Sequence, residues 1–244
     1  MNDLTDSGII LDLRAHGENH AIVNILSAAH GRIAGFLFGG QGRRQQPNVQ
    51  PGNRVNLTLT HKIMSQLGTL QLELVHNPSV GVLHDPARLA ALQFLCPLLA
   101  RMLPEYHPYP NLFIAAAKFF DNLSGSEWAA QYVMLELKLL AELGYGLDLT
   151  QCAMTGSRDV TQLAYVSPKT GRAATAAAAV GYERNLLPLP KFIISPATAM
   201  PHEIRAGLQL TGYFLERHME VWQYQPLHQV RSRLLNYFQN QMAA

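Results

Sequence analysis

Between residues 8 and 76, apolar and polar side chains alternate with a period of two. A period of two is typical of strands that bury one face. Three segments alternate clearly, and two short, mostly apolar runs lie between them, giving candidate strands at 9–13, 21–26, 33–38, 55–59 and 70–74. Because glycines and other turn residues separate these segments, we expect five strands that close into a small barrel, of either the OB-fold or the SH3-like type.

The pattern changes to a helical period after Pro78. Asp85 followed by Pro86 is a start signal, because Asp caps a helix and Pro suits the first helical position. Leucines then recur along one stripe as far as Leu103, as in a helix with one buried face. A later helix should stop at Gly144, a residue that suits a C-terminal cap. The sequence predicts five helices, at about 86–103, 111–123 and 127–143, from Pro201, and after Pro226.

Residues 145–200 show no clear period, because glycines, prolines and a run of alanines interrupt them. The chain has 244 residues, which is enough for one large domain or two small ones. We therefore predict an α+β protein with a five-stranded barrel in residues 1–79 and a helical domain in residues 80–244. The irregular segment at about 145–200 is an insertion into that helical domain.

Composition narrows the class of protein only slightly. The formal net charge is +2 and the sequence pI is about 8.6, a balance that permits nucleic-acid binding without arguing for it. The only cysteines, Cys96 and Cys152, are far apart, so a disulfide framework is excluded and a reducing cytosol fits best. The first six residues are polar and acidic, unlike a signal peptide, and every apolar run is too short to span a membrane. We expect a soluble, cytoplasmic protein.

A glycine-rich basic segment at 39–52 is the first candidate for binding. It lacks the ending of a phosphate-binding loop, so we interpret it as a mobile loop that places Arg43 and Arg44 on nucleic-acid phosphates, or as a solvated loop that binds nothing. Phe36 and Phe38 share one side of their strand, where they either stack on bases or, as is more usual, belong to the core. The other basic candidates for DNA binding are Arg14, Arg32, Arg54 and Lys62 in the barrel, and Lys169, Arg172, Arg231 and Arg233 beyond it.

Metal and catalytic motifs are not evident. His16 and His20 have metal-like spacing, but no third ligand accompanies them and a polar turn explains them better. Cys152 stands where half of a zinc knuckle would begin, but Thr155 replaces the second cysteine, so we expect a buried hydrophobic residue and no zinc. The nucleophile elbow and the paired histidines of metalloproteases are also missing. We expect neither enzymatic activity nor a cofactor.

Four tracts occur in an order that resembles the RecO family of bacterial recombination mediators. They are 17–26 (GENHAIVNIL) with 30–33 (HGRI), 50–52 (QPG) before a strand, 139–148 (LLAELGYGLD) and 163–172 (LAYVSPKTGR). The resemblance runs from about residue 8 to residue 238 and implies an OB-fold followed by a helical domain. It also implies binding of single- and double-stranded DNA, annealing of complementary strands, and a nucleoid-associated role in DNA repair. Some members carry two cysteine pairs where this chain keeps Cys152 alone.

The resemblance further implies three protein partners. RecO-like proteins work with RecR, contact the C-terminal tail of single-stranded-DNA-binding protein, and so help RecA replace that protein on DNA. An acidic tail ending in apolar residues needs an apolar groove flanked by positive charge, for which the long helices offer Arg101, Lys118 and Lys138. An OB-fold that binds RNA or another protein is the alternative function, and a hydrolase built on the helical domain is a further one without a motif.

Overall fold

The computed structural model describes residues 2–61, 67–195, 198–218 and 225–242. The chain packs into two compact units. The first comprises Met1–Ser124 with Gln229–Arg231, and the second comprises Gly125–His228 with Ser232–Ala244. The barrel therefore shares its unit with the first two helices, while the domain boundary expected at residue 79 stays a prediction.

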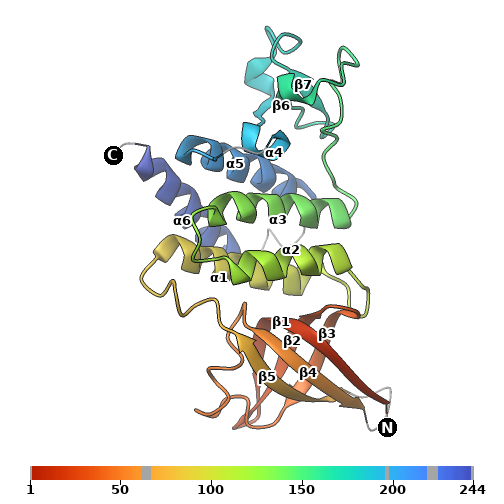
Figure 1. Cartoon of the computed structure of the whole chain (residues 1–244), viewed down its shortest axis with the longest axis vertical. Coiled ribbons are helices and arrows are strands. Elements are labelled where there is room, and N and C mark those ends of the chain that lie inside the picture. Colours follow the sequence, from red (N-terminus) through yellow and green to blue (C-terminus); the bar gives the residue numbers. More distant parts are fainter. Residues whose placement is uncertain (1, 62–66, 196–197, 219–224, 243–244) are drawn as a thin grey trace. The chain divides into compact units, whose positions relative to one another are not determined.

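The first unit begins with a closed five-stranded barrel (Figure 1). The strands follow the order β1-β2-β3-β5-β4, and every pair is antiparallel except β3 with β5. This order is that of an OB-fold, so the prediction of an OB-fold barrel is confirmed. The strands are β1 (Asn2–His16), β2 (His20–Ser27), β3 (Gly31–Leu37), β4 (Arg54–His61) and β5 (Thr69–His76).

A register shift in β1 changes which side chains face the barrel interior. Ile10 pairs with Ile25 and lies in the barrel core, whereas the shift before Asp12 turns Asp12 and Arg14 outward. Ile9 and Leu11 are also fully buried, although they do not belong to that core. α1 (Pro86–Met102) packs against β1 and β2. The first strand is consequently buried on both faces over one part of its length.

Residues 39–50 lie in the segment that we expected to be a mobile loop, and the structure gives them a defined path. They form consecutive turns in which the Gly42 N–H donates to the Gly39 carbonyl and the Gln45 N–H to the Gly42 carbonyl, at 2.8 and 2.9 Å. Val49 inserts into the barrel core and is only 3% exposed. This apolar anchor follows the glycine-rich stretch, and it explains why a segment of such composition keeps a defined path.

The two helices of the first unit are joined by a segment that lies along the barrel. Asp85 caps α1 as predicted, because its Oδ1 accepts hydrogen bonds from the N–H groups of the next turn. Between α1 and α2 (Pro110–Asp121), the Tyr106 N–H donates to the Arg32 carbonyl of β3 at 2.9 Å. Gly31, at φ +73°, lies so close to the His107 carbonyl that a Cβ atom would stand 1.8 Å from its oxygen.

The second unit contains α3 (Trp128–Glu142), α5 (Pro201–His218) and α6 (Gln225–Gln241), whose residues 229–231 belong to the first unit. α3 packs against α5, and the buried Glu136 carboxylate accepts a hydrogen bond from the Thr211 hydroxyl. α3 ends at Glu142, and the predicted cap glycine, Gly144, follows at φ +86°. The N–H groups of Gly144 and Tyr145 cap the carbonyls of Ala141 and Leu140 at 3.1 and 2.8 Å.

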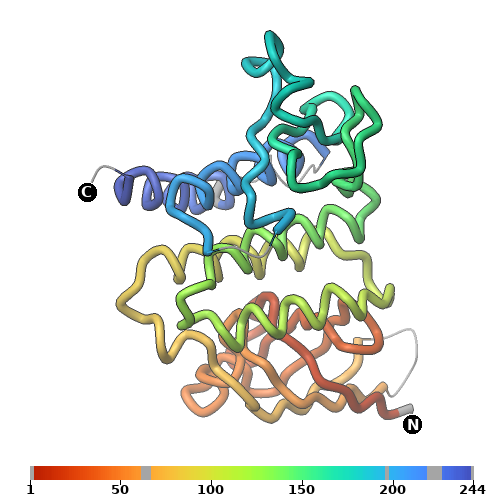
Figure 2. Tube along the Cα trace, turned by 45° about the horizontal axis from the view of Figure 1, so that its top comes forward, coloured from red at the N-terminus to blue at the C-terminus, as the bar shows by residue number. Residues whose placement is uncertain are grey.

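The insertion is more regular than its composition suggested. It contains a three-stranded sheet in the order β7-β6-β8. Figure 2 shows the path of the chain through the insertion, from the green end of α3 to the blue α5. Its elements are β6 (Leu163–Val166), β7 (Ala173–Thr175), β8 (Leu187–Pro188), α4 (Lys191–Ile194) and 3-10 turns at Val160–Gln162 and Glu183–Asn185. Strands this short carry too few alternating positions to show a period in the sequence.

Cys152 is buried beside this sheet, as expected, with its Sγ accepting the Thr175 N–H at 3.4 Å. Burial raises the pKa of the Cys152 thiol, but hydrogen bonds from Thr155, Thr175 and Met154 outweigh that effect and lower the pKa to about 6. Burial also raises the pKa of Cys96 far above its ordinary value, so the pKa values of the two thiols are shifted in opposite directions. Within the described residues, no helix combines the length and apolar character that crossing a membrane requires.

Candidate nucleic-acid interface

One end of the barrel presents a row of outward side chains from β1, β2 and β3. The register places Arg14 opposite Ile22 and Ile22 opposite Phe36, while His16 faces His20 across the tight turn between β1 and β2. Because side chains alternate between the two faces of a strand, these partners all point away from the barrel core. The strand pairing thus gathers residues that lie far apart in the sequence.

Four rings in this row form what we call the aromatic cluster: His16, His20, Phe36 and Phe38. The ring centroids of Phe36 and Phe38 are 4.8 Å apart, and His20 lies 5.2 Å from Phe36 and 5.3 Å from Phe38. His16 approaches the edge of Phe36 at 5.6 Å. Phe38 is 61% exposed and Phe36 is half-buried. The interpretation of these phenylalanines as core residues is therefore wrong, since both lie on the outer surface.

The basic loop is held at the same end of the barrel. The Gln41 N–H donates to the Asn19 carbonyl at 3.2 Å, and the Gln41 side chain donates to the His20 carbonyl at 2.8 Å. The Gly39 N–H donates to His20 Nδ1 at 3.2 Å. These bonds attach the loop to the turn between β1 and β2, beside the aromatic cluster. Arg43 and Arg44 follow directly and are both exposed.

Two other predicted DNA-binding residues are engaged in holding the first unit together. Arg32 donates from Nε to the Leu103 carbonyl at 2.6 Å and forms an ion pair with Glu105 at 3.1 Å. Arg54 pairs with Asp121, at the end of α2, at 2.5 Å. Both arginine side chains are more than half buried. Their charges are therefore largely compensated within the protein, in contrast to those of Arg43 and Arg44.

The remaining sequence candidates belong to other parts of the chain. Lys62 lies outside the described residues. Arg231 is only 2% exposed and sits over the Phe94 ring at 5.0 Å, so its prediction as a DNA contact is wrong. In the second unit, Lys169 and Arg233 are exposed, while Arg172 forms an ion pair with Asp148 at 3.6 Å.

A buried polar cluster at the opposite end of β2 could be mistaken for a catalytic triad. The Asp6 carboxylate accepts hydrogen bonds from the Ser27 hydroxyl and the Ala29 N–H, and His30 Nδ1 lies 3.4 Å away. Burial raises the pKa of Asp6, but the bonds from Ser27, Ala29 and Ser7 outweigh it and hold the pKa below 3.8. The Ser27 hydroxyl donates to Asp6 and also lies 3.4 Å from His30 Nδ1, but Ser27 is completely buried, so its hydroxyl is not open to a substrate.

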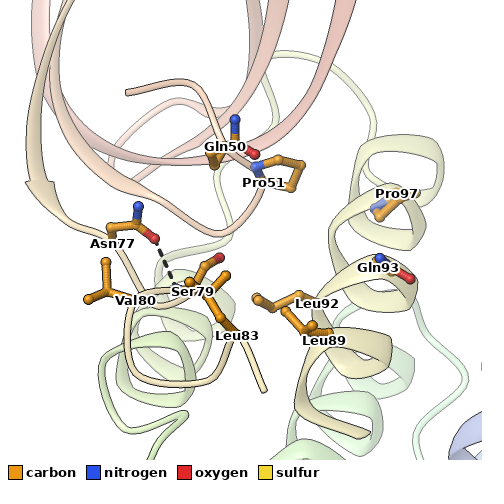
Figure 3. Close-up of a pocket in the computed structure, with 10 residues that line it drawn as sticks. All are labelled: Gln50, Pro51, Asn77, Ser79, Val80, Leu83, Leu89, Leu92, Gln93 and Pro97. Carbon is orange, nitrogen blue, oxygen red and sulfur yellow. Dashed lines mark hydrogen bonds between the residues drawn. The ribbon is translucent and has the colours of Figure 1, made fainter. Parts of the chain in front are cut away.

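An apolar groove lies between α1 and the connection that precedes it (Figure 3). Leu89 and Leu92 form one wall, while Val80 and Leu83 face them from the connection and are 73% and 61% exposed. The groove encloses about 510 Å³, and its lining residues carry no charge. They are Gln50, Pro51, Asn77, Ser79, Val80, Leu83, Leu89, Leu92, Gln93 and Pro97.

Of the three basic residues predicted for a partner tail, Arg101 contacts the lining of the groove. Its guanidinium donates to the carbonyl of Pro97, a lining residue, at 3.2 Å. Lys118 is exposed in the last turn of α2. Lys138 belongs to the second unit and forms an ion pair with Glu142 at 3.0 Å. Arg101 and Lys118 therefore belong to the first unit and Lys138 to the second.

Sequence reasoning weighed His16 and His20 as metal ligands, preferred a polar turn between strands, and missed their place among the aromatic rings. The signal was available in the spacing. Two residues that flank a three-residue turn between antiparallel strands face each other, so both histidines had to share one side of the hairpin. The distance between this hairpin and Phe38 could not be obtained in that way, because it depends on how β2 and β3 pair.

Comparison with known proteins gives a consistent result over nearly the whole chain. Residues 1–78 match the family model described as recombination protein O N terminal, and residues 83–225 match recombination protein O C terminal. A DNA repair protein RecO from Rhodospirillum centenum is 44% identical over 232 residues, which cover 95% of this chain and 93% of the relative. The RecO proteins of Cereibacter sphaeroides and Rhodospirillum rubrum are 39% and 40% identical, with at least 97% of each chain covered.

Proposed function

Because the chain belongs to the RecO family of DNA repair proteins, we propose that it binds single-stranded DNA on the outer face of β1–β3 and anneals complementary strands. The observation that carries this proposal is the exposed aromatic cluster beside Arg14, Arg43 and Arg44. Aromatic rings and cations on one surface are the two components that single-stranded nucleic acid requires.

The two components have separate roles in binding. Bases stack on exposed rings, and each stacked base contributes roughly 1–3 kcal/mol whatever its identity. Phe38 offers the most exposed ring of the cluster, with 61% of its surface accessible. Guanidiniums neutralise phosphates, which carry no sequence information. The expected binding is therefore strong at low salt and indifferent to sequence.

Annealing follows from charge neutralisation without any covalent step. Two complementary strands repel each other through their phosphates, and basic side chains that contact both strands lower that repulsion. Duplex DNA would be held by the phosphate contacts alone, because its bases are not free to stack on Phe38. We accordingly propose a binding protein without enzymatic activity or cofactor that acts on DNA in the cytoplasm, at the nucleoid.

The test compares the protein with a Phe38→Ala variant in fluorescence anisotropy with labelled single-stranded DNA. We expect the variant to bind about fivefold or more weakly, because one stacking ring is lost. Tyr182→Ala is the matched control, since Tyr182 is an aromatic residue that is 59% exposed and belongs to the second unit, not to the aromatic cluster. Equal affinities of the protein and Phe38→Ala would exclude the aromatic cluster from the site. Stronger binding of structured RNA than of single-stranded DNA would favour the alternative RNA-binding function.

We further propose that the protein works with RecR and helps RecA replace single-stranded-DNA-binding protein, whose C-terminal tail it would hold. The apolar groove and Arg101 supply an apolar cleft with a neighbouring positive charge for such a tail. A Leu83→Ser variant should bind an acidic peptide with an apolar end more weakly than the unmodified protein. The exposed Ile114 of α2 is 65% accessible, so Ile114→Ser is the control. Undiminished peptide binding by Leu83→Ser would place the tail elsewhere.

A further inference from the structure

The second unit contains a column of three nearly parallel rings that leads from its core to its surface. Phe214 is 3% exposed and its ring is parallel to that of His218, at a centroid distance of 6.2 Å and an angle of 6°. The His218 ring stacks in turn on Tyr145 at 4.5 Å and 15°. Tyr145 is 41% exposed and forms the outer end of the column. Phe214 and His218 are four residues apart on α5, so they lie on one helix face.

The backbone holds Tyr145 in place independently of its ring. Gly144 adopts φ +86°, and the Tyr145 N–H then caps the Leu140 carbonyl of α3 at 2.8 Å. This tight turn directs the chain away from α3 immediately after the helix ends. The backbone of Tyr145 is thus fixed and the stacked His218 ring orients the side chain, so little conformational entropy remains to be lost when a ligand stacks on it.

A basic turn lies beside this column. The Asp148 N–H donates to the Gly171 carbonyl at 3.0 Å, which ties the turn at 167–172 to the segment that follows Tyr145. Arg217, the neighbour of His218 on α5, donates to the Pro168 carbonyl. Asp148 compensates Arg172 at 3.6 Å, whereas Arg217 and Lys169 form no ion pair within the part of the chain that the structure describes.

We propose that Tyr145 is the stacking platform for a nucleobase of a second DNA strand, whose phosphates meet Lys169 and Arg217. A base placed on Tyr145 continues a column that already has a buried end, and the cations flank it as a sugar-phosphate backbone requires. An acidic peptide would use the cations but leave the flat face of the ring unused. The inference rests on the proposed annealing function, because it assigns one strand to the barrel and the complementary strand to the second unit.

The experiment measures the annealing of two complementary labelled oligonucleotides and, separately, the anisotropy of one of them. Tyr145→Leu removes the aromatic ring but keeps an apolar side chain, and we expect the annealing rate to fall about fivefold or more. Affinity for one strand should change less than about twofold, since the barrel surface remains. Tyr145→Phe should anneal like the unmodified protein because the ring is kept. Tyr182→Leu, another exposed tyrosine of the second unit, is the matched control.

An annealing rate that is unchanged in Tyr145→Leu, or reduced equally in Tyr182→Leu, would overturn the inference. Failure of the unmodified protein to bind single-stranded DNA would instead defeat the proposed function, and this inference with it. Photocrosslinking of the unmodified protein covers the case in which Tyr145→Leu does not fold. With excess oligothymidine carrying 5-iododeoxyuridine, we expect a crosslinked peptide that contains Tyr145, and its absence would also overturn the inference.

Discussion

Replacing Arg43 and Arg44 together by alanine tests the electrostatic half of the proposed DNA site. Both side chains are exposed, and neither forms an ion pair among the described residues, so their loss should change folding stability by less than about 0.5 kcal/mol. If each guanidinium neutralises one phosphate, the variant releases two fewer counterions on binding. For single strands each contact contributes about 0.7 to the slope of log affinity against log salt.

The slope should therefore flatten by about 1.4 in the double variant. Over a fourfold rise in salt, the unmodified protein would lose roughly sevenfold more affinity than the variant. Fluorescence anisotropy across a salt series measures this directly, with oligothymidine and a mixed sequence as two probes. Both probes should respond equally, because phosphate contacts carry no sequence information.

A matched control distinguishes local contacts from a general loss of positive charge. Arg158 and Arg184 are exposed in the second unit, and their double alanine variant has the same net charge as the variant of the barrel loop. We expect this control to keep the slope of the unmodified protein to within about 0.3. An unchanged slope in the Arg43 and Arg44 variant, or an equal flattening in the control, would refute the reasoning that places DNA on this loop.

Three further predictions concern the fold. Gly31→Ala should lower the free energy of unfolding in urea by about 2 kcal/mol or more, because its Cβ would collide with the His107 carbonyl at a positive φ; a smaller loss would contradict this contact. The pKa of Asp6 is lowered on folding, so its stabilising contribution is complete above pH 3.8 and is lost as pH falls through the folded-state pKa. The free energy of unfolding of the protein and of Asp6→Asn can be measured at about pH 7, about pH 5 and about pH 3. The difference between the two should shrink at the lowest pH, and a constant difference would contradict the hydrogen bonds around Asp6. The absorbance of the thiolate at about 240 nm should rise with pH, with a midpoint at about pH 6, because Cys152 ionises while Cys96 stays protonated. This rise should be absent in Cys152→Ala. A midpoint near the ordinary thiol pKa would contradict the hydrogen bonds around Cys152.

Local signals in the sequence predicted most of the elements. Three strands of the barrel were visible because their inward side chains repeat every second residue, as Val55, Leu57 and Leu59 do, and the other two were visible as short apolar runs between turn residues. The start of α1 at Asp85 and the end of α3 before Gly144 were equally visible, since capping depends on neighbours within one turn. The small sheet of the insertion escaped detection because β8 has only two residues.

The tertiary structure alone decided which basic residues remain available to a ligand. Arg32, Arg54 and Arg231 look no different from Arg43 in the sequence, yet the first two are held in ion pairs and the third is buried. The ion-pair partners, Glu105 and Asp121, lie 67 or more residues away along the chain. Arg231 contacts Phe94, which belongs to another helix. Pairing of this kind depends on long-range packing, which no local pattern encodes.

The aromatic cluster illustrates the same division. The sequence by itself determined that Phe36 and Phe38 share one side of a strand, because alternation is a property of the extended backbone. It could not determine whether that side faces the core or the solvent. Closure of the barrel turned Ile33 and Leu37 inward and left the phenylalanines outside, where β2 brought His20 against them. A local pattern thus determines which side chains lie on the same face of a strand, and the packing of distant strands determines which residues those side chains contact.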